Sequence, residues 1–256
     1  MALYFLFAFI LGSAFGSFIN VVSDRIVAGK SLLGRSLCDH CKTPLAVLDL
    51  VPIVSFVGLG ARCRYCRKPL SSQYPIVEFV CASLFTVAFY VLVQNAELSL
   101  IKFAYFLFLI CTMMVIAIVD FKYSLIPTTF AFFGSFVALF YNYFFMSSPI
   151  FVDSVLAAFA GAFAFAVIII LTRGRGMGQG DIVLAFMMGM VLGLRSLLIA
   201  LFLSFLGGAV VALVLVALRR KKFGQTIPFA PFLVLGFLVA LFWGEQILNW
   251  YLGVLY

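Results

Sequence analysis

Residues 98–119, LSLIKFAYFLFLICTMMVIAIV, form an apolar run that contains a single charged residue, Lys102. A helix needs roughly 20 apolar residues to cross the hydrocarbon core of a bilayer. This run is long enough for one membrane span, and an acidic residue, Asp120, follows it directly. Similar runs recur from the first residue to the last. The pattern therefore predicts an all-α polytopic membrane protein.

The composition supports the same class. The 256 residues are 66% hydrophobic and 10% charged, with a mean hydropathy of +1.24. A typical globular chain is about 45–50% apolar and about 25% charged. The opening segment 1–15 lacks a basic region and is followed by further charge. We therefore interpret it as the first span and not as a cleaved signal peptide.

We expect about eight transmembrane helices, at residues 2–22, 75–94, 98–119, 127–146, 151–172, 182–194, 197–218 and 229–250. The run 182–218 could form one long helix or a hairpin that turns at residues 193–196. A single span would place Arg173 and Arg175 on the opposite side from the basic cluster 219–222, against the positive-inside rule. We therefore predict the hairpin.

The predicted topology turns both termini outward. It places in the cytosol the segments 23–74, 120–126, 173–181 and 219–228. These segments carry every Lys and Arg except Lys102 and Arg195, so positive-inside topology explains the formal net charge of +8 and no nucleic acid partner is expected. Asp120 then closes the third helix and Asp181 opens the sixth at the same face. Two carboxylates distant in sequence are thus expected to share one membrane depth.

Residues 23–74 are the polar exception, because charged residues gather there together with four of the six cysteines. We expect three parts: a first span at 1–22, a cytosolic four-cysteine domain at 23–74, and a seven-helix transmembrane domain at 75–256. The cysteines form two C-x-x-C pairs. Each pair is followed by a basic residue, one variable residue and Pro-Leu, which indicates an internal repeat.

The four cysteines, Cys38, Cys41, Cys63 and Cys66, predict a structural zinc site. Paired C-x-x-C motifs suit tetrahedral Zn²⁺, and a site with four protein ligands has no open position for catalysis. Disulfides and redox pairs are the alternatives, and disulfides are rare in a cytosolic loop. His40, the only histidine, lies between two ligands and is interpreted as a bystander.

Two acidic residues point to catalysis. Asp181 ends a glycine-rich turn, where its simplest role is a helix N-cap. Asp120 ends an apolar helix, where an acid opposes the helix dipole. Together the two carboxylates could share a proton and activate a water, as in aspartic proteases. We hypothesise that Asp181 is the initial base because a helix N-terminus favours its ionised form, while the proton belongs to the pair.

These residues resemble a known family. Gly178-Gln179-Gly180-Asp181 is similar to the G-x-G-D motif of intramembrane aspartic proteases. Four further segments resemble, in order, the pattern of type IV prepilin peptidases: GSFINVV at 16–22, GRSLC at 34–38, SQYPIVE at 72–78 and IPFAP at 227–231. The resemblance covers nearly the whole chain. It implies eight spans, a cytosolic zinc-binding loop and catalytic roles for Asp120 and Asp181, with Gly178, Gly180, Pro127 and Glu78 as supporting motif residues.

The resemblance also implies a function. Family members cut after a short basic leader of type IV prepilins or secretion pseudopilins, and many methylate the new amino terminus with S-adenosylmethionine. The long cysteine-bearing loop favours the bifunctional type. We thus expect a multi-pass protein of the bacterial inner membrane, in contact with lipids and prepilins, whose active site faces the cytosol. Val183 departs from the lysine frequent at its position, and no glycine-rich nucleotide fingerprint is present, so methylation rests on the resemblance alone.

Other interpretations remain open at this point. Glu78, in the first turn of a span, either complements the helix N-terminus or takes part in substrate or methyl chemistry. Asn20 and Arg25 are placed at the boundary of loop and membrane, with partners that the sequence does not fix. The alternative function is an ion-coupled transporter, which predicts acids near the bilayer centre and inverted repeats. A zinc-loop scaffold would leave the two aspartates unexplained.

Overall fold

The computed structural model describes all residues except 39, 175–176, 219–227 and 256. The basic cluster 219–222, Arg175 and Ile227 therefore lie outside the described residues. In the described part the secondary structure is helical apart from two isolated β-bridges. The chain divides into two compact units, Met1–Val115 and Ile116–Tyr256. The predicted division at residues 22 and 74 concerns function and stays a prediction.

Seven of the described helices are long and apolar enough to cross a membrane. They are α1 (Ala2–Val27), α3 (Gln73–Gln94), α4 (Leu100–Tyr123), α5 (Thr128–Phe145), α6 (Ser148–Leu171), α7 (Gln179–Ala217) and α8 (Ala230–Leu255). The helical multi-pass architecture is thus confirmed. Several helices run past the predicted ends, since α1 continues to Val27 and α4 to Tyr123.

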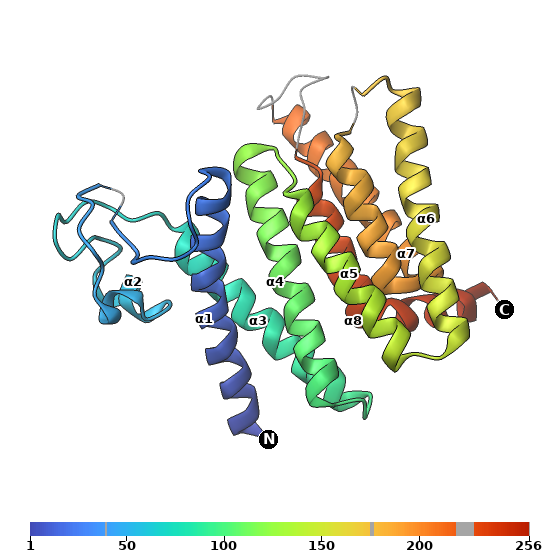
Figure 1. Cartoon of the computed structure of the whole chain (residues 1–256), viewed down its shortest axis with the longest axis horizontal. Coiled ribbons are helices and arrows are strands. Elements are labelled where there is room, and N and C mark those ends of the chain that lie inside the picture. Colours follow the sequence, from blue (N-terminus) through green and yellow to red (C-terminus); the bar gives the residue numbers. More distant parts are fainter. Residues whose placement is uncertain (39, 175–176, 219–227, 256) are drawn as a thin grey trace. The chain divides into compact units, whose positions relative to one another are not determined.

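In the first unit, α1 packs side by side with α3 through two glycines one turn apart (Figure 1). A Cβ added to Gly12 would lie 2.7 Å from the Ala82 Cα, and one added to Gly16 would lie 2.6 Å from the Glu78 Cα. No larger residue fits at this distance, which is the usual reason for small residues between membrane helices. The backbones of α1 and α3 therefore touch near the end of α1 that leads into the loop.

Asn20 and Arg25 find their partners in the same region. The Asn20 Nδ2 donates to the Tyr74 carbonyl at 3.3 Å and so ties α1 to the start of α3. The Arg25 guanidinium donates to the carbonyls of Leu32 at 2.8 Å and Arg35 at 3.0 Å, which folds the segment after α1 back onto the helix. The rest of the loop contains only η1 (Val47–Leu50) and the short α2 (Val54–Gly58).

In the second unit, α7 is broken at Gly193, whose φ of 70° and ψ of 172° are not helical. A Cβ on Gly161 of α6 would lie 3.0 Å from the Ala185 carbonyl and 3.2 Å from the Leu197 side chain. In a continuous helix these two residues would be about 18 Å apart along the axis, at about 1.5 Å per residue. The chain must therefore turn back between them.

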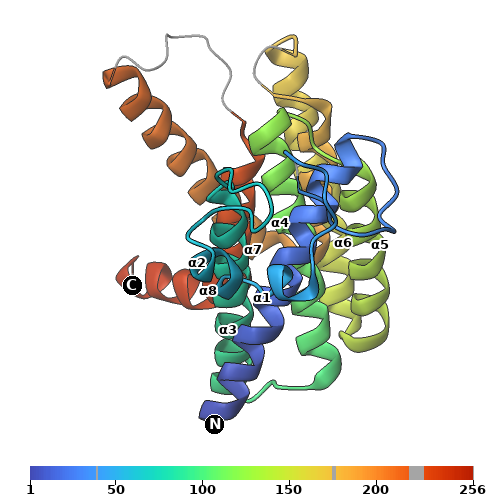
Figure 2. The same cartoon turned by 90° about the vertical axis from the view of Figure 1, so that its left-hand side faces the viewer.

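The turn at Gly193 has a specific partner. The Leu194 amide donates to the Asp153 carboxylate of α6 at 3.0 Å. Figures 1 and 2 show α7 running along α6 and then returning, so that the two ends of α7 lie at the same end of the unit. The predicted hairpin is confirmed. The two halves of α7 correspond to the two spans expected at 182–194 and 197–218.

Candidate active site

Asp120 lies in the last turn of α4. The prediction that it closes this helix is wrong, because the helix continues to Tyr123. Its carboxylate is 5% exposed, and one oxygen accepts a hydrogen bond of 3.1 Å from the amide of Ala230, the first residue of α8. Helix N-terminal amides have no partner within their own helix and favour negative charge. The unfavourable position at the end of α4 is therefore offset by the start of α8.

Asp181 lies in the first turn of α7, and the N-cap of this helix is Gly178. One oxygen of the Asp181 carboxylate accepts a hydrogen bond of 2.9 Å from the Gly178 amide. The other oxygen, Oδ1, is buried and has no hydrogen-bond partner among the described residues. The simplest interpretation of Asp181, that it is the helix N-cap, is therefore wrong. It reaches back from the helix and keeps one oxygen for another partner.

The structure brings these two carboxylates together within the second unit. A Cβ on Gly180 would lie 2.7 Å from the Ile126 Cβ, so the first turn of α7 packs directly on the loop that follows α4. Pro127 ends this loop as the N-cap of α5. Asp120 and Asp181 are close enough to interact electrostatically. Each is held by one backbone amide, and a like charge nearby favours the protonated form of one of the two.

The four cysteines of the loop also come together. Their sulfur atoms all lie within 4.8 Å of one another, and the Cys38 and Cys66 sulfurs are 3.9 Å apart. Zinc–sulfur bonds of about 2.3 Å in a tetrahedron place the sulfurs about 3.8 Å apart. The cluster therefore has the size that a tetrahedral metal ion requires. His40 is exposed and does not belong to it.

The two C-x-x-C segments have the same backbone structure, which confirms the internal repeat. Isolated bridges pair Leu37 with Pro44 and Arg62 with Pro69. The Cys38 amide donates to the Thr43 carbonyl at 3.0 Å, and the Cys63 amide donates to the Lys68 carbonyl at 2.9 Å. The basic residue after each pair, Lys42 or Arg67, has a φ of 56°. We refer to residues 36–45 and 61–70 as the first and second knuckle.

Hydrogen bonds within the knuckles act on the thiols. Those from the Thr43 hydroxyl and amide lower the pKa of Cys41 to about 6. The amides of Cys66 and Tyr65 lower the pKa of Cys63. The Lys68 amide also lowers the pKa of Cys66, but burial and the three neighbouring cysteines outweigh it and raise the pKa to about 11. Thiolates are the form that binds metals, so the hydrogen bonds at Cys41 and Cys63 favour the metal-binding form.

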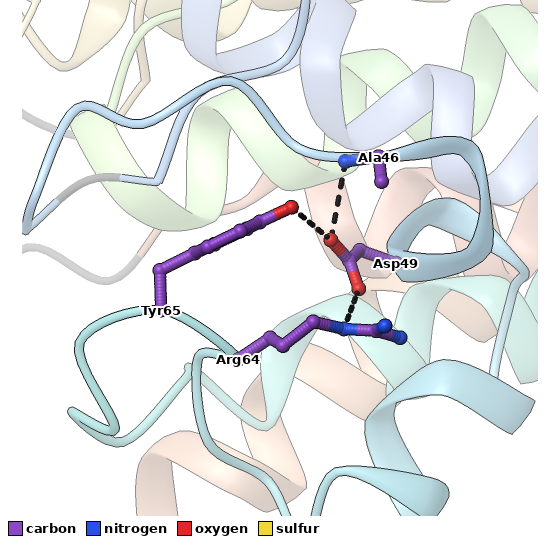
Figure 3. Close-up of polar contacts among 4 residues, drawn as sticks. All are labelled: Ala46, Asp49, Arg64 and Tyr65. Atoms are coloured by element: carbon purple, nitrogen blue, oxygen red, sulfur yellow. Dashed lines mark hydrogen bonds and ion pairs between the residues drawn. The ribbon is translucent and has the colours of Figure 1, made fainter.

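Asp49 joins η1 to the second knuckle (Figure 3). One oxygen forms an ion pair of 2.7 Å with the Arg64 Nε. The other accepts hydrogen bonds from the Ala46 amide at 3.1 Å and the Tyr65 hydroxyl at 3.2 Å. Burial and the Asp49 carboxylate raise the pKa of Tyr65, so its hydroxyl stays protonated as a donor. The sequence offered no signal for this role, because Asp49 looks like one charge among many.

Glu78 belongs to the unit Met1–Val115 and supports the same loop. Its Oε2 accepts a hydrogen bond of 2.7 Å from the Ile53 amide. Glu78 is 7% exposed although it is an acid near the start of α3. Its contact with Ile53 is tertiary, so Glu78 does more than complement the helix N-terminus.

Comparison with known proteins adds independent findings. A family model described as "Bacterial Peptidase A24 N-terminal domain" matches residues 10–92, which include the four clustered cysteines. A second, described as "Type IV leader peptidase family", matches residues 107–213, which include both aspartates. No solved structure matches the chain.

Relatives match over nearly the full length. A Bacillus subtilis protein named prepilin leader peptidase/N-methyltransferase is 34% identical, over 95% of this chain and 96% of its own. A protein of the same name from Aeromonas hydrophila is 30% identical, over 98% of this chain and 94% of its own. Since the match covers both the region of the cysteine cluster and the region of the two aspartates, the chain belongs to the type IV leader peptidase family.

Proposed function

We propose that this protein is an aspartic endopeptidase of the membrane that removes the leader of type IV prepilins or pseudopilins, and that it then methylates the new amino terminus with S-adenosylmethionine. The observation that carries the peptidase assignment is the pair of buried carboxylates, Asp120 and Asp181, each held by one backbone amide. The names of the relatives support the substrate and the second activity.

In this proposal Asp181 is the general base and acts through Oδ1, the oxygen without a protein partner among the described residues. The base takes a proton from water, and the oxygen of that water attacks the scissile carbonyl. Asp120, in its protonated form, donates to the carbonyl oxygen and stabilises the tetrahedral intermediate. The C–N bond then breaks, and the leaving amine takes up a proton from the pair. The helix positions support the choice of base, because Asp181 lies at the N-terminus of its own helix, which favours a negative charge, whereas Asp120 lies near the C-terminus of α4.

The edge position of both aspartates also weighs against the transporter. Asp120 lies in the last turn of α4 and Asp181 in the first turn of α7, whereas ion pathways place acids near the centre of the bilayer. We infer that this edge faces the cytosol of a bacterial inner membrane. The basic loops of the sequence support this orientation.

We also propose that Cys38, Cys41, Cys63 and Cys66 hold a structural zinc ion. The sulfur spacing supports this metal, and a set of four thiolates leaves no position for substrate. The bound ion would hold the two knuckles together.

The test of the peptidase assignment is a mass spectrum of a prepilin after incubation with the purified protein. We expect the loss of a short amino-terminal leader and, when S-adenosylmethionine is added, the gain of one methyl group on the new terminus. A prepilin that stays uncut with folded, zinc-loaded protein would contradict the assignment. A product that is cut but not methylated would support the peptidase assignment and contradict the methyltransferase assignment.

A further inference from the structure

The unit Met1–Val115 contains a cavity of about 710 Å³ that the proposed peptidase chemistry does not use. Its lining residues all fall between Ser17 and Glu78, and they come from α1, from the start of α3 and from the loop with both knuckles. Sites for small molecules and cofactors measure about 300–1,000 Å³. The cavity is thus large enough for one cofactor-sized ligand.

The lining of this cavity carries charges of both signs, and Asp24, Asp49 and Glu78 are its acids. Glu78 is buried, at 7% exposed, whereas Lys30, Arg35 and Lys42 are exposed. Among the described residues, no ion pair joins Glu78 to a basic side chain. A buried carboxylate without a counter-ion favours a cation beside it. The cavity therefore suits a ligand with a positive group inside and a negative group at the rim.

The turn that donates a hydrogen bond to Glu78 is strained. The Val54 amide donates to the Pro52 carbonyl at 2.6 Å, and Ile53 between them has a φ of 62° and a ψ of −51°. These are the features of a γ-turn with positive φ, which is rare and is unfavourable for a β-branched residue. The hydrogen bond from the Ile53 amide to Glu78 holds this turn in place. Such strain is typical of ligand sites, where the surrounding structure fixes the conformation.

Part of the cavity wall is apolar. Phe56 and Leu59, both half-buried, line the cavity from α2 and the residue after it. A flat aromatic base packs well on such a surface. The lining of the cavity contains a single glycine, Gly34, and therefore no glycine-rich turn of the kind that cradles phosphates, so a nucleoside without phosphate fits better than a nucleotide.

We propose that this cavity is the binding site of the methyl donor, S-adenosylmethionine, an inference that rests on the proposed methylation. Glu78 would offset the positive sulfonium, Lys30 and Lys42 would bind the carboxylate, and Phe56 would contact the adenine. The basic leader of a prepilin is the less suitable occupant because the rim is itself basic. The strained turn would keep Glu78 in place before the ligand arrives.

Equilibrium binding of radiolabelled S-adenosylmethionine to the full-length protein in nanodiscs tests the proposal. Ser55→Trp fills the cavity from α2, and Val57→Trp on the same helix is the matched control, since Val57 is 71% exposed and is not a lining residue. We expect at least tenfold weaker binding for Ser55→Trp and unchanged binding for Val57→Trp. S-adenosylhomocysteine should compete, and ATP should not.

A second pair of variants uses the internal repeat and avoids large side chains. Lys42 and Arg67 occupy the same position in the two knuckles, with the same φ of 56°, but only Lys42 lines the cavity. A charge-assisted hydrogen bond corresponds to about tenfold or more in affinity. Lys42→Gln should therefore weaken donor binding about tenfold, and Arg67→Gln should leave it unchanged. The zinc content of both proteins confirms that the knuckles are folded.

The outcomes separate this inference from the peptidase. Donor binding that persists in Asp181→Asn, which should not cut prepilin, supports a separate site. Equal binding by Ser55→Trp and the wild type would overturn the proposal, as would a wild type that cuts prepilin and binds no donor. The proposal would also be overturned if Ser55→Trp lost the binding of a prepilin peptide but still bound the donor. A wild type that binds the donor but does not cut prepilin would remove the proposed peptidase function and retain the cavity assignment.

Discussion

The cysteine cluster and the aspartate pair are assembled by different forces. The cysteines lie in a loop whose helical pieces, η1 and α2, have no buried residues, and turn hydrogen bonds and one buried acid give it its shape. The aspartates lie at the ends of long helices that pack closely, α7 against both α6 and α8. From this difference we expect the loop to depend on a bound ion for its stability, whereas helix packing and backbone hydrogen bonds position the aspartates.

The largest expected effect is on the aspartate pair. Asp120→Asn and Asp181→Asn should each reduce leader cleavage by at least about 10²-fold, because neither amide can exchange the proton that the reaction requires. The double variant should be no worse than either single one, since residues that act as a unit are not additive. Timed mass spectrometry of a prepilin substrate measures the rates. Near-normal cleavage by either folded variant would contradict the hypothesis that the two aspartates act together in catalysis.

Loss of the metal should affect the other region. Cys63→Ser, or treatment with a strong chelator, should release the ion and unfold the loop, because apparent zinc binding of about 10–16 kcal/mol is folding free energy in small zinc domains. Limited proteolysis should then cut within residues 30–70, while the helices keep their circular dichroism. Cys111→Ser, in α4 and outside the cluster, is the control. A loop that stays protected without metal would disprove the dependence.

Packing at the aspartate pair can be disturbed without touching its carboxylates. In Gly180→Ala the added Cβ would lie 2.7 Å from the Ile126 Cβ, and overpacking of this kind costs about 1–3 kcal/mol. A shift of Asp181 by a fraction of an ångström should lower cleavage about tenfold or more. Gly178→Ala is the matched control, because its nearest contact, the Asp181 carboxylate, would lie at 3.7 Å. Equal rates for the two variants would show that this packing does not position the aspartate.

Much of the fold could be predicted from hydropathy and charge. Apolar runs located the spans, and the distribution of Arg and Lys resolved the 182–218 ambiguity in favour of the hairpin that Gly193 provides. Helix ends were less predictable. Both α1 and α4 extend into polar sequence, because backbone hydrogen bonds and local caps decide where a helix ends, while hydropathy reports only the membrane boundary.

For the site, the sequence predicted which residues gather but not what holds them. Spacing and motifs singled out the four cysteines and the two aspartates. The amide of Ala230 against Asp120, the role of Asp49 and the strained turn at Ile53 were missed. Each of these depends on a contact between segments that are distant in the chain or on an unusual backbone angle. Composition and periodicity give no information about such contacts or angles.

The smallest expected effect is that of replacing Arg64. This substitution tests how much of the loop's stability comes from side-chain contacts and how much from the bound ion. The Arg64 side chain is 47% exposed while that of its partner, Asp49, is 3% exposed. Solvent screens such a pair, so Arg64→Ala should cost under about 1 kcal/mol, read as the midpoint of chelator-induced zinc release. Asp49→Ala should cost more, because the Tyr65 hydroxyl and the Ala46 amide would lose their acceptor along with Arg64. If Arg64→Ala releases zinc as readily as Asp49→Ala does, the ion pair and not the hydrogen bonds holds η1 to the second knuckle, and the loop has a polar core of its own beside the metal.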